Sequence, residues 1–517
     1  MLLQSLVGTS GEISATRSRS AKTRLIAEAL RTAEPDEVQT VVSYLSGELR
    51  QRRIGVGWRS LQRLPTPAAE PTLTVAETHD AFERMSRVSG SGSQAARAEM
   101  VDDLFGRATA DEQRYLALLV MGELRQGALD GVMLSAVSEA SGVPDHVVRR
   151  AVMLCGATGP VAAVALGEGQ DALDRFGLEV SRPLRPMLAA SAPDVPGAMA
   201  KVAADEPAAL EWKVDGIRVQ VHRDQDEVRV FTRSLDDITA RVPEIVEAVR
   251  ALPATALVLD GEAVTLDDDG RARPFQATGS RTASSANVDE LRRQAPLTPY
   301  FFDLLHLDGA DLLDLPASGR HERLAAVVPE HQRMPRLVTD DVSAAARFFA
   351  EAVAAGHEGV VVKRLDDPYE AGRRGSGWVK VKPRHTLDLV VLAAEWGHGR
   401  RRGWLSNLHL GARDEQTGEF VMLGKTFKGM TDEMLTWQTE RLLELETRRD
   451  RYAVYVRPEL VVEIAFDGVQ TSPRYPAGMA LRFARVLRYR DDKSAPEADT
   501  VSMLRAIHAG DTRPTGV

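Results

Sequence analysis

The spacing of hydrophobic residues divides the chain into a helical part and a strand-rich part. From residue 1 to about 175, apolar residues recur at intervals of three and four, which predicts amphipathic helices. From Glu211 onward the pattern alternates, and WKVDGIRVQVHR and EVRVFTR flank the polar turn Asp224 to Asp226, which predicts an antiparallel hairpin. The stretch from Gly167 to Pro186 breaks the helical period and marks a domain boundary.

Two groups of predicted strands follow this hairpin. The first comprises ALVLDGEAVTL, PYFFDLLHL, GVVVKR and GWVKVKP, with helix-like intervals at Pro243–Leu252 and Ser343–Ala355. This order is typical of an α+β domain with mainly antiparallel sheets. After Pro383 come further short strands with one helix, DEMLTWQTERLLELE, which predict a small β-barrel such as an OB-fold.

The helical part contains an internal repeat. The string GELRQ at Gly47 recurs 75 residues later at Gly122. We interpret the repeat as the duplication of a helical unit.

Length and composition limit the class of protein. A chain of 517 residues is longer than one hydrophobic core usually organises, which favours two to four domains. With 44% hydrophobic and 27% charged residues, the composition is that of a soluble globular protein. A single cysteine, Cys155, excludes an intramolecular disulfide framework and a zinc site of several thiolates. No signal peptide or membrane span is evident, so we expect a cytoplasmic protein with no membrane partner.

Lysine is scarce in this chain. Of the 65 basic residues, 9 are lysines and the rest are arginines, although the net charge is -9. Arginine stays protonated in proteins, whereas lysine can lose a proton and attack an electrophile. The positions of the lysines therefore point to candidate chemistry.

The string E-W-K-V-D-G-I-R places Lys213 between two strand-like segments, at a tight Asp-Gly corner. A lysine that attacks at neutral pH needs neighbouring cations or burial to lower its pKa. Arg218 is one nearby cation, and Lys380 and Lys382 alternate along VKVKP, which predicts two amines on one strand face. The alternative is an ordinary hairpin with a surface lysine.

Two carboxylates stand beside apolar strands, Glu262 in LDGE and Glu358 in HEGVVVK. Oxygen ligands of this kind suit Mg²⁺ bound together with substrate phosphates. A single such glutamate is more often a solvated strand end. Together with a nucleophilic lysine and a lysine pair, the two describe a nucleotidyl-transfer site.

These strings occur in the order seen in the covalent nucleotidyltransferases, and the chain resembles an ATP-dependent DNA ligase. The resemblance assigns Lys213 as the residue that becomes adenylated and Arg218 as its motif partner. T-R-S resembles the next motif, usually Ser-Arg-Asn, so it assigns Arg233, while Ser234 departs from the usual Asn. By the same resemblance Glu262 contacts the ribose or a metal.

The remaining motifs of the nucleotidyltransferase domain follow in the family's order. Phe302 in YFFD matches the aromatic residue that stacks on adenine, although a core aromatic in a strand would look the same. Glu358 resembles the metal-binding fourth motif, and Lys380 with Lys382 the fifth. Glu211, two residues before the nucleophile, is assigned to the nucleotide site as well.

The C-terminal string LRFARVLRYRDDK is similar to the sixth motif, which lies in the OB domain of these ligases. Ala484 stands where a common form has proline. The resemblance implies that Arg482, Arg485 and Lys493 reach the ATP phosphates when the OB domain closes. The alternative is a basic strand facing solvent.

The resemblance covers nearly the whole chain and implies a multidomain protein. Its parts are an all-α DNA-binding domain (1–175), an α+β adenylation (nucleotidyltransferase) domain with antiparallel sheets (186–384), a C-terminal β-barrel OB-fold (388–495) and a tail (496–517). GELRQG and the preceding Gly/Ser loop carry the match of the first domain. We expect flexible linkers near 175–186 and 384–390.

The implied function is the sealing of nicks in duplex DNA through a covalent lysyl-AMP and an adenylated 5′-phosphate, in repair, replication or recombination. The implied cofactors are ATP and Mg²⁺, with Mn²⁺ as a substitute, and the partner is nicked double-stranded DNA. We expect a monomer, associated with the nucleoid in a bacterium. The alternatives are an RNA ligase, an RNA-capping guanylyltransferase and a non-catalytic DNA-end-binding protein. A single cysteine disfavours an NAD-dependent ligase with its four-thiolate zinc site.

Overall fold

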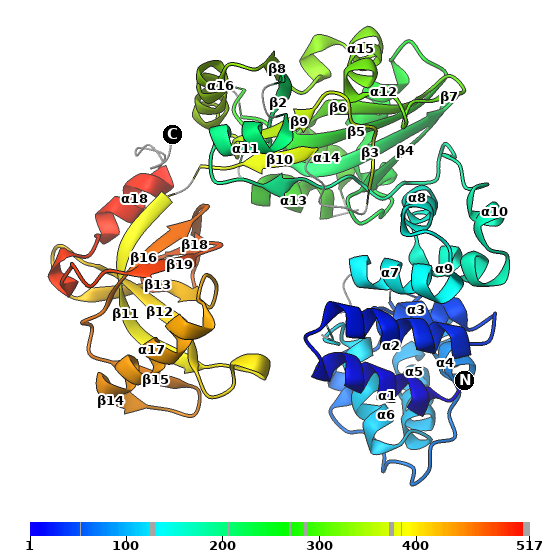
Figure 1. Ribbon diagram of the computed structural model, residues 1–517, viewed down its shortest axis with the longest axis horizontal. Helices are drawn as coiled ribbons and strands as arrows, with labels where there is room; N and C mark the ends of the chain where they lie inside the picture. The colour runs from blue at the N-terminus through cyan, green and yellow to red at the C-terminus, as the bar shows by residue number, and fades with distance from the viewer. Residues whose placement is uncertain are drawn as a thin grey trace. The chain divides into compact units, whose positions relative to one another are not determined.

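The computed structural model describes residues 1–51, 53–124, 126, 130–203, 206–267, 270–273, 275–283, 287–371, 377–383 and 385–509 (Figure 1). Its contacts divide the chain into two compact units. Unit 1 comprises Met1–Ala190, Val214–Arg336 and Lys363–Trp378, and unit 2 comprises Ser191–Lys213, Leu337–Val362 and Val379–Val517. The chain therefore passes between the units several times, and each unit is described by itself.

The N-terminal part of unit 1 is helical, as the apolar spacing predicts. Its helices are α1 (Leu3–Ala15), α2 (Arg19–Thr32), α3 (Val38–Leu45), α4 (Val75–Arg87), α5 (Ser93–Gly106), α6 (Ala110–Val120), α7 (Asp130–Ser141), α8 (Asp145–Cys155), α9 (Thr158–Gly167) and α10 (Gln170–Leu173). Their apolar faces share one core of leucine, isoleucine, valine and aromatic side chains. Within the described residues, no helix has both the length and the apolarity needed to cross a bilayer.

The repeated string GELRQ marks two helix ends. Gly47 follows α3 and Gly122 follows α6, each with positive φ, at +79° and +66° respectively. In both copies the glutamate after the glycine donates its backbone N–H to a carbonyl five residues earlier, which is the Schellman C-cap. The copies also touch, because a Cβ on Gly47 would lie 2.9 Å from the carbonyl oxygen of Leu124. The two copies of the repeat therefore form the same kind of C-terminal helix cap. Arg125 and Gly127 of the second copy, GELRQG, lie outside the described residues.

The remainder of unit 1 is built on an antiparallel sheet of five strands in the order β4-β3-β5-β6-β7. The strands are β3 (Ile217–Asp224), β4 (Glu227–Thr232), β5 (Ala256–Thr265), β6 (Leu297–Leu307) and β7 (Ala310–Asp311). The predicted hairpin is confirmed as β3 and β4. Helices α12 (Pro243–Arg250) and α15 (Ala317–Val327) supply side chains to the core on one face of the sheet.

A second sheet of five strands has the order β1-β10-β9-β2-β8. The strands are β1 (Ala190–Ser191), β2 (Ala208–Trp212), β8 (Arg336–Thr339), β9 (Val360–Arg364) and β10 (Trp378–Val381). Helix α16 (Val342–Ala354) packs on β2 and on α11 (Val195–Val202). This sheet carries the ends of β2 and β9, where two of the predicted motifs lie.

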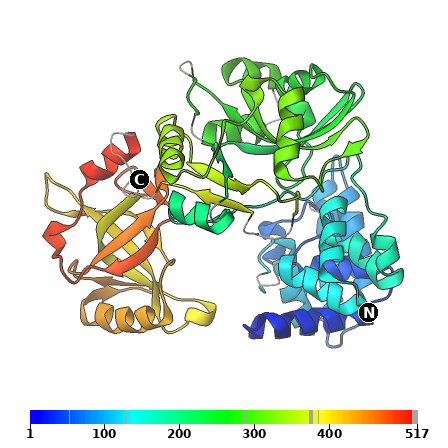
Figure 2. The same ribbon diagram turned by 45° about the horizontal axis from the view of Figure 1, so that its top comes forward.

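The C-terminal part of unit 2 contains a sheet of seven strands, β11 (His385–Trp396), β12 (Leu405–Arg413), β13 (Phe420–Thr426), β14 (Glu446–Arg449), β15 (Ala453–Val456), β16 (Val461–Phe466) and β19 (Arg485–Tyr489). The long strand β11 pairs with β12, β15 and β16. Helix α17 (Asp432–Glu444) lies beside this sheet (Figures 1 and 2). Its Leu435 and Leu442 are buried in the core of the sheet. Among the described strands no ladder closes the sheet into a barrel, so the predicted barrel is not confirmed.

Two further elements complete this region. Strands β17 (Gly468–Thr471) and β18 (Met479–Arg482) form a separate hairpin. Helix α18 (Val501–Ala509) lies within the segment predicted as a tail, and its Val501 and Leu504 are buried in the core of the seven-stranded sheet. Residues 501–509 therefore pack as part of the fold, because their apolar side chains have a surface to cover.

Candidate active site

Two backbone hydrogen bonds within unit 2 join Lys213 to the segment Glu358–Gly359. Lys213 directly follows β2, and its N–H donates to the carbonyl of Gly359 at 2.7 Å, while the N–H of Glu358 donates to the carbonyl of Lys213 at 2.8 Å. Gly359 has a φ of +120°, and a Cβ there would lie 2.2 Å from the carbonyl oxygen of Val381. The glycine after Glu358 is required because three segments meet at this point.

The side chain of Glu358 lies between two lysine amines. Lys213 Nζ is 2.6 Å from Oε2 and Lys382 Nζ is 2.7 Å from Oε1. Burial alone would raise the pKa of Glu358, but the two neighbouring ammonium groups outweigh it and lower the pKa to about 2. The carboxylate is therefore ionised at neutral pH. A second carboxylate, Asp467, lies 3.8 Å from Lys382 Nζ.

Lys213 and Glu358 each follow an aromatic residue in the chain, Trp212 and His357 respectively. The Trp212 ring packs against Phe348 and His357, with ring centroids 6.2 Å and 4.9 Å away. Burial lowers the pKa of His357, which keeps the imidazole neutral at neutral pH. Glu211 on β2 is buried and Lys380 on β10 is half-buried.

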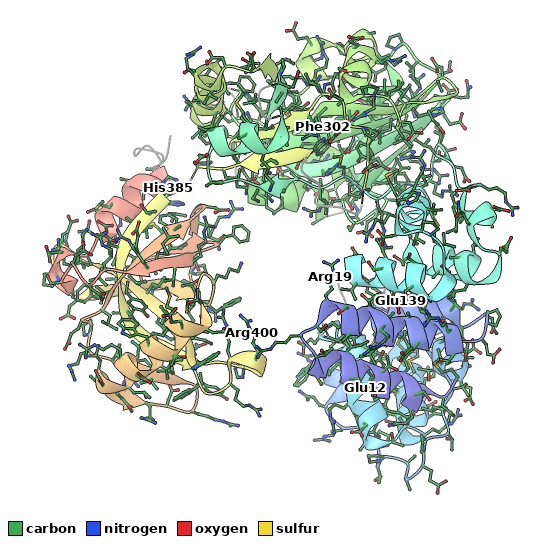
Figure 3. All side chains as sticks on the ribbon, in the orientation of Figure 1. Glu12, Arg19, Glu139, Phe302, His385 and Arg400 are labelled. Carbon is green, nitrogen blue, oxygen red and sulfur yellow. The ribbon has the colours of Figure 1, made fainter. Side chains whose placement is uncertain are left out.

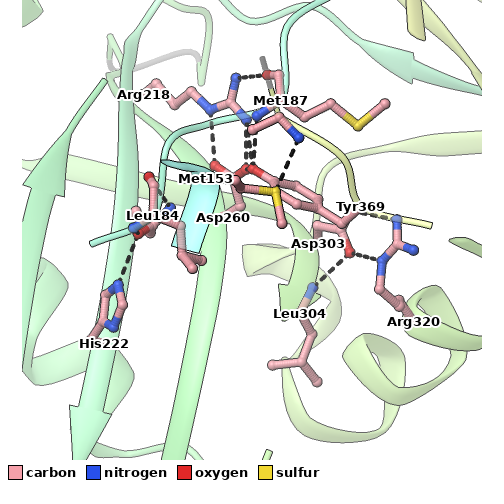
Figure 4. A network of polar contacts seen from close by, with 12 residues as sticks. Met153, Leu184, Met187, Arg218, His222, Asp260, Asp303, Leu304, Arg320 and Tyr369 are labelled. Atoms are coloured by element: carbon pink, nitrogen blue, oxygen red, sulfur yellow. Dashed lines mark hydrogen bonds and ion pairs between the residues drawn. The ribbon is translucent and has the colours of Figure 1, made fainter. Parts of the chain in front are cut away.

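Arg218, which was predicted to act as a cation near the nucleophile, has its charge balanced by a buried carboxylate (Figure 4). Its Nε and Nη2 donate to the two oxygens of Asp260 at 3.0 Å and 2.6 Å. Burial alone would lower the pKa of Arg218, but Asp260 outweighs it and raises the pKa, so Arg218 stays protonated. The prediction missed this pairing because alternation along a strand does not reveal the neighbour across the ladder.

Phe302, labelled in Figure 3, lies on β6. Cations and a second aromatic ring surround it. Its ring is 8% exposed and meets Trp378 edge-on at 5.8 Å. Lys363 Nζ lies 4.3 Å from the centroid of Phe302 and 4.0 Å from that of Trp378, and Arg218 lies 5.4 Å from the Phe302 centroid. Cation–π attraction therefore contributes to the packing of the two cations against the two aromatic rings. Stacking of Phe302 on adenine stays a prediction.

The other two predicted residues of unit 1 lie on or beside the same sheet. Glu262 is half-buried on β5, directly opposite Arg218 in the ladder. Gly216, from the Asp-Gly corner, approaches this strand so closely that a Cβ would lie 2.2 Å from the carbonyl oxygen of Ala263. Arg233 is exposed in the turn after β4, where Ser234 donates to Asp236 at 2.5 Å. The side chain of Ser234 thus forms a hydrogen bond within this turn.

The residues of the sixth motif lie on the C-terminal sheet and hairpin. Arg482 ends β18 and Arg485 begins β19, with Arg485 Nη1 3.7 Å from Asp467. Lys493 Nζ donates to Asp388 at 2.6 Å, and this hydrogen bond raises the pKa of Lys493. Arg490 also donates to Asp388, at 2.7 Å. Asp388 and Asp467 had no signal in the sequence, because each meets its partner through the fold.

The basic loop between β11 and β12 is exposed. Arg400 has a side chain that is 53% exposed and lies 4.0 Å from Asp432 (Figure 3). Contacts at this range and exposure contribute little to stability. The loop is thus available to a ligand.

The described residues contain no group of three or more His, Cys, Asp or Glu side chains that could hold a metal ion by themselves. Mg²⁺ in nucleotide sites typically takes one or two carboxylates and completes its shell with phosphates and water. Glu358 and Glu262 are the two carboxylates that the sequence singles out for this role.

Three family models match the chain, and together they cover more than half of it. The ATP dependent DNA ligase domain matches residues 186–382, the ATP dependent DNA ligase C terminal region 401–493, and the DNA ligase N terminus 58–138. The chain belongs to the ATP-dependent DNA ligases. The three matches follow the order of the helical, nucleotidyltransferase and C-terminal regions described above.

Individual relatives agree with this assignment over the full length. The chain is 60% identical to a "Probable DNA ligase" from Nocardioides sp. (strain ATCC BAA-499 / JS614), covering 98% of this chain and 99% of the relative. It is 61% identical to a "Probable DNA ligase" from Beutenbergia cavernae, with the same coverage. The solved structure "Pmar-Lig_PreS3" is 18% identical, with a TM-score of 0.61 over 94% of this chain and 99% of its own, which shows the shared fold.

Proposed function

We propose that this chain seals nicks in duplex DNA with ATP, through a lysyl-AMP formed on Lys213. The observation that carries the proposal is the placement of the amines of Lys213 and Lys382 on the two oxygens of Glu358. Membership of the ATP-dependent DNA ligases supports the overall reaction. The residue roles below are part of the proposal, and the distances around Glu358 support them.

In the first step, Lys213 Nζ forms a bond to the α-phosphorus of ATP, and the bond from that phosphorus to the bridging oxygen of pyrophosphate breaks. The amine must first lose a proton. Glu358 is a weak base at its low pKa, so it orients the amine while the proton passes to solvent. Lys382 stabilises the charge that develops on the phosphate oxygens.

In the second step, an oxygen of the 5′-phosphate at the nick attacks the same phosphorus, and the bond to Lys213 breaks. The 3′-hydroxyl then attacks the 5′-phosphorus, loses its proton and releases AMP. Neither of these steps needs a second molecule of ATP. Bound Mg²⁺, with Mn²⁺ as its substitute, would neutralise phosphate charge during transfer, and Glu262 in unit 1 and Glu358 in unit 2 are the candidate carboxylate ligands.

The wider architecture fits this proposal. We propose that residues 388–495 form an OB-fold, since the seven strands and α17 share one core. Residues 1–175 would bind duplex DNA through its phosphates, largely independently of sequence. We propose a monomer, associated with the nucleoid when the host is a bacterium. Adenine stacking on Phe302 and phosphate binding by Arg482, Arg485 and Lys493 belong to the same proposal.

A sealing assay tests this function against the alternatives. The full chain is incubated with ATP, Mg²⁺ and a duplex that carries one 5′-³²P-labelled nick, with matched substrates in which the nicked strand is RNA. We expect the DNA nick to be sealed with ATP and not with NAD. Sealing only of RNA would favour an RNA ligase, and covalent labelling only by GTP would favour a guanylyltransferase. Binding without sealing would favour a DNA-end-binding protein.

Asp388→Asn is expected to speed the formation of lysyl-AMP at low ATP concentration by up to about fivefold. Asp388 holds Lys493 at 2.6 Å, so this lysine must leave the carboxylate before it can bind a nucleotide phosphate. An ion pair of this partly exposed kind contributes at most about 1 kcal/mol, which sets the size of the effect. The measurement is the initial rate of labelling by α-³²P-ATP below saturation.

Glu463→Gln is the matched control for Asp388→Asn. Glu463 lies directly opposite Asp388 in the ladder and pairs with Arg488 at 2.7 Å. Removing this neighbouring pair should leave the labelling rate unchanged. A slower rate in Asp388→Asn would show that Asp388 holds Lys493 in its productive position.

The contribution of Glu358 to the free energy of unfolding is expected to decrease at acidic pH. Its pKa is lowered from 4.5 to about 2 by the two amines, so its stabilising contribution is complete above pH 4.5 and is lost as pH falls toward 2. The difference in free energy of unfolding between the native chain and Glu358→Gln should therefore be constant from pH 7 to 4.5. Urea unfolding at pH 6, 4.5 and 3.5 measures it, and a difference that grows below pH 4.5 would contradict the assignment.

A further inference from the structure

We propose that Tyr369 is a positioning residue whose hydroxyl holds Arg218 so that one N–H of the guanidinium faces a phosphate oxygen of the substrate. This inference rests on the proposed ligase function and deepens it. Tyr369 belongs to none of the motifs that the sequence singled out. It lies between β9 and β10, and the fold brings it to Arg218 (Figure 4).

Most of the guanidinium of Arg218 is already committed. Nε and Nη2 each donate to Asp260, Nη1 donates to the carbonyl of Met187 at 2.6 Å, and Nη2 donates to the hydroxyl of Tyr369 at 3.3 Å. A guanidinium carries five N–H donors, so these contacts leave one N–H on Nη1 without an acceptor among the described residues. The side chain of Arg218 is 14% exposed, and we infer that this N–H is the donor that a ligand meets.

The hydroxyl of Tyr369 is the point where the contacts of Arg218 converge. It donates to Asp260 Oδ2 at 2.7 Å and accepts the N–H of Met187 at 3.1 Å, in addition to the contact from Arg218. Tyr369 and Asp260 are fully buried. A buried carboxylate that accepts from both a guanidinium and a hydroxyl has little freedom to rotate, so the hydroxyl fixes the plane of the guanidinium.

The ring of Tyr369 is itself held on several sides. Its backbone N–H donates to Leu313 at 2.8 Å, the Trp378 ring meets it edge-on at 6.1 Å, and Arg320 lies 5.9 Å from its centroid. Arg320 in turn is bound by the buried Asp303. The hydroxyl therefore has a fixed position from which to orient Arg218.

A phosphate oxygen is the ligand that suits this N–H, because a guanidinium N–H is a directed donor to an anionic oxygen. The neighbouring charges are Asp260 and Glu262 on β5, and Lys363, which lies over the same pair of aromatic rings as Arg218. Correct aim of that donor contributes to the rate only in the steps where the phosphate is in place.

The test compares Tyr369→Phe, Arg218→Lys and the double variant in the full chain by rapid-quench kinetics. Three rates are measured, namely lysyl-AMP formation, AMP transfer to the nick phosphate and strand closure. We expect Tyr369→Phe to slow, by about tenfold, the same step that Arg218→Lys slows. In the Arg218→Lys background the tyrosine change should then have no further effect, because Tyr369 acts through Arg218.

Tyr115→Phe is the matched control, because its buried hydroxyl donates to the carbonyl of Tyr44 at 3.0 Å in the helical part of the same unit. It should leave all three rates unchanged. Slowing of a different step, no slowing, or an equal penalty in the Arg218→Lys background would overturn the inference. If the native chain itself fails to seal nicks, the proposed function fails instead.

A second substitution covers the case in which Tyr369→Phe does not fold. Incorporation of 3-fluorotyrosine at position 369 keeps the ring and the hydroxyl but weakens the oxygen as an acceptor. We expect a smaller slowing of the same step, with an unchanged melting temperature. Unchanged rates in the folded fluorinated chain would likewise overturn the inference.

Discussion

Lys213→Arg is expected to abolish covalent labelling by α-³²P-ATP, lowering the rate of lysyl-AMP formation by about a thousandfold or more. Arginine keeps the positive charge next to Glu358 but cannot lose its proton to become a nucleophile. The geometry of the ion pair, 2.6 Å in the native chain, can be retained in part while the chemistry is lost. The label is measured after denaturing electrophoresis, which leaves only covalent AMP on the protein.

Lys201→Arg supplies the control for this experiment. Lys201 is an exposed lysine near the end of α11 in the same unit, so its replacement should leave labelling intact. A duplex that already carries AMP on the nick phosphate should still be sealed by Lys213→Ala, because closure needs no lysine nucleophile. Persistent labelling of Lys213→Arg would assign the nucleophile to another residue.

Glu358→Gln is expected to lower the rate of lysyl-AMP formation by about a hundredfold. The native carboxylate binds both amines, and a neutral amide leaves Lys213 and Lys382 without a shared acceptor. The amines would then repel each other and lose their fixed orientation, which is a cost to positioning and to phosphate binding. The same labelling assay, run as a single turnover at saturating ATP, measures the change.

Glu395→Gln tests whether this effect is specific to the site. Glu395 also binds a lysine, Lys425, on the C-terminal sheet, and both side chains are similarly half-buried. Its replacement should change stability slightly and leave the labelling rate unchanged. Equal losses in the two variants would mean that Glu358 acts through general stability.

Local patterns in the sequence were sufficient for the secondary structure and the family. The alternation of WKVDGIRVQVHR and EVRVFTR gave the β3–β4 hairpin, because side chains on a strand alternate between two faces. The intervals of three and four gave the N-terminal helices in the same way. The order of the short motifs resembled that of the ATP-dependent DNA ligases, and the family models confirm this family.

Closure of a sheet, in contrast, depends on pairing between strands that are far apart in the chain. The sequence predicted a barrel after Pro383. The described ladders form a sheet with β11 at its centre, and closure of this sheet into a barrel stays a prediction. The packing of α18, within the predicted tail, was not foreseen, because the apolar face of this helix is short and gains its partners only in the fold.

The sequence by itself determined the family and the candidate groups for its chemistry, such as Lys213 and Glu358. Only the tertiary structure decided which of their charges are balanced, as with Asp260 on Arg218 and Asp388 on Lys493. The physical reason is that charge interactions act through space over a few ångströms. Asp388 and Lys493 are separated by more than a hundred residues in the chain, and no local pattern records their contact.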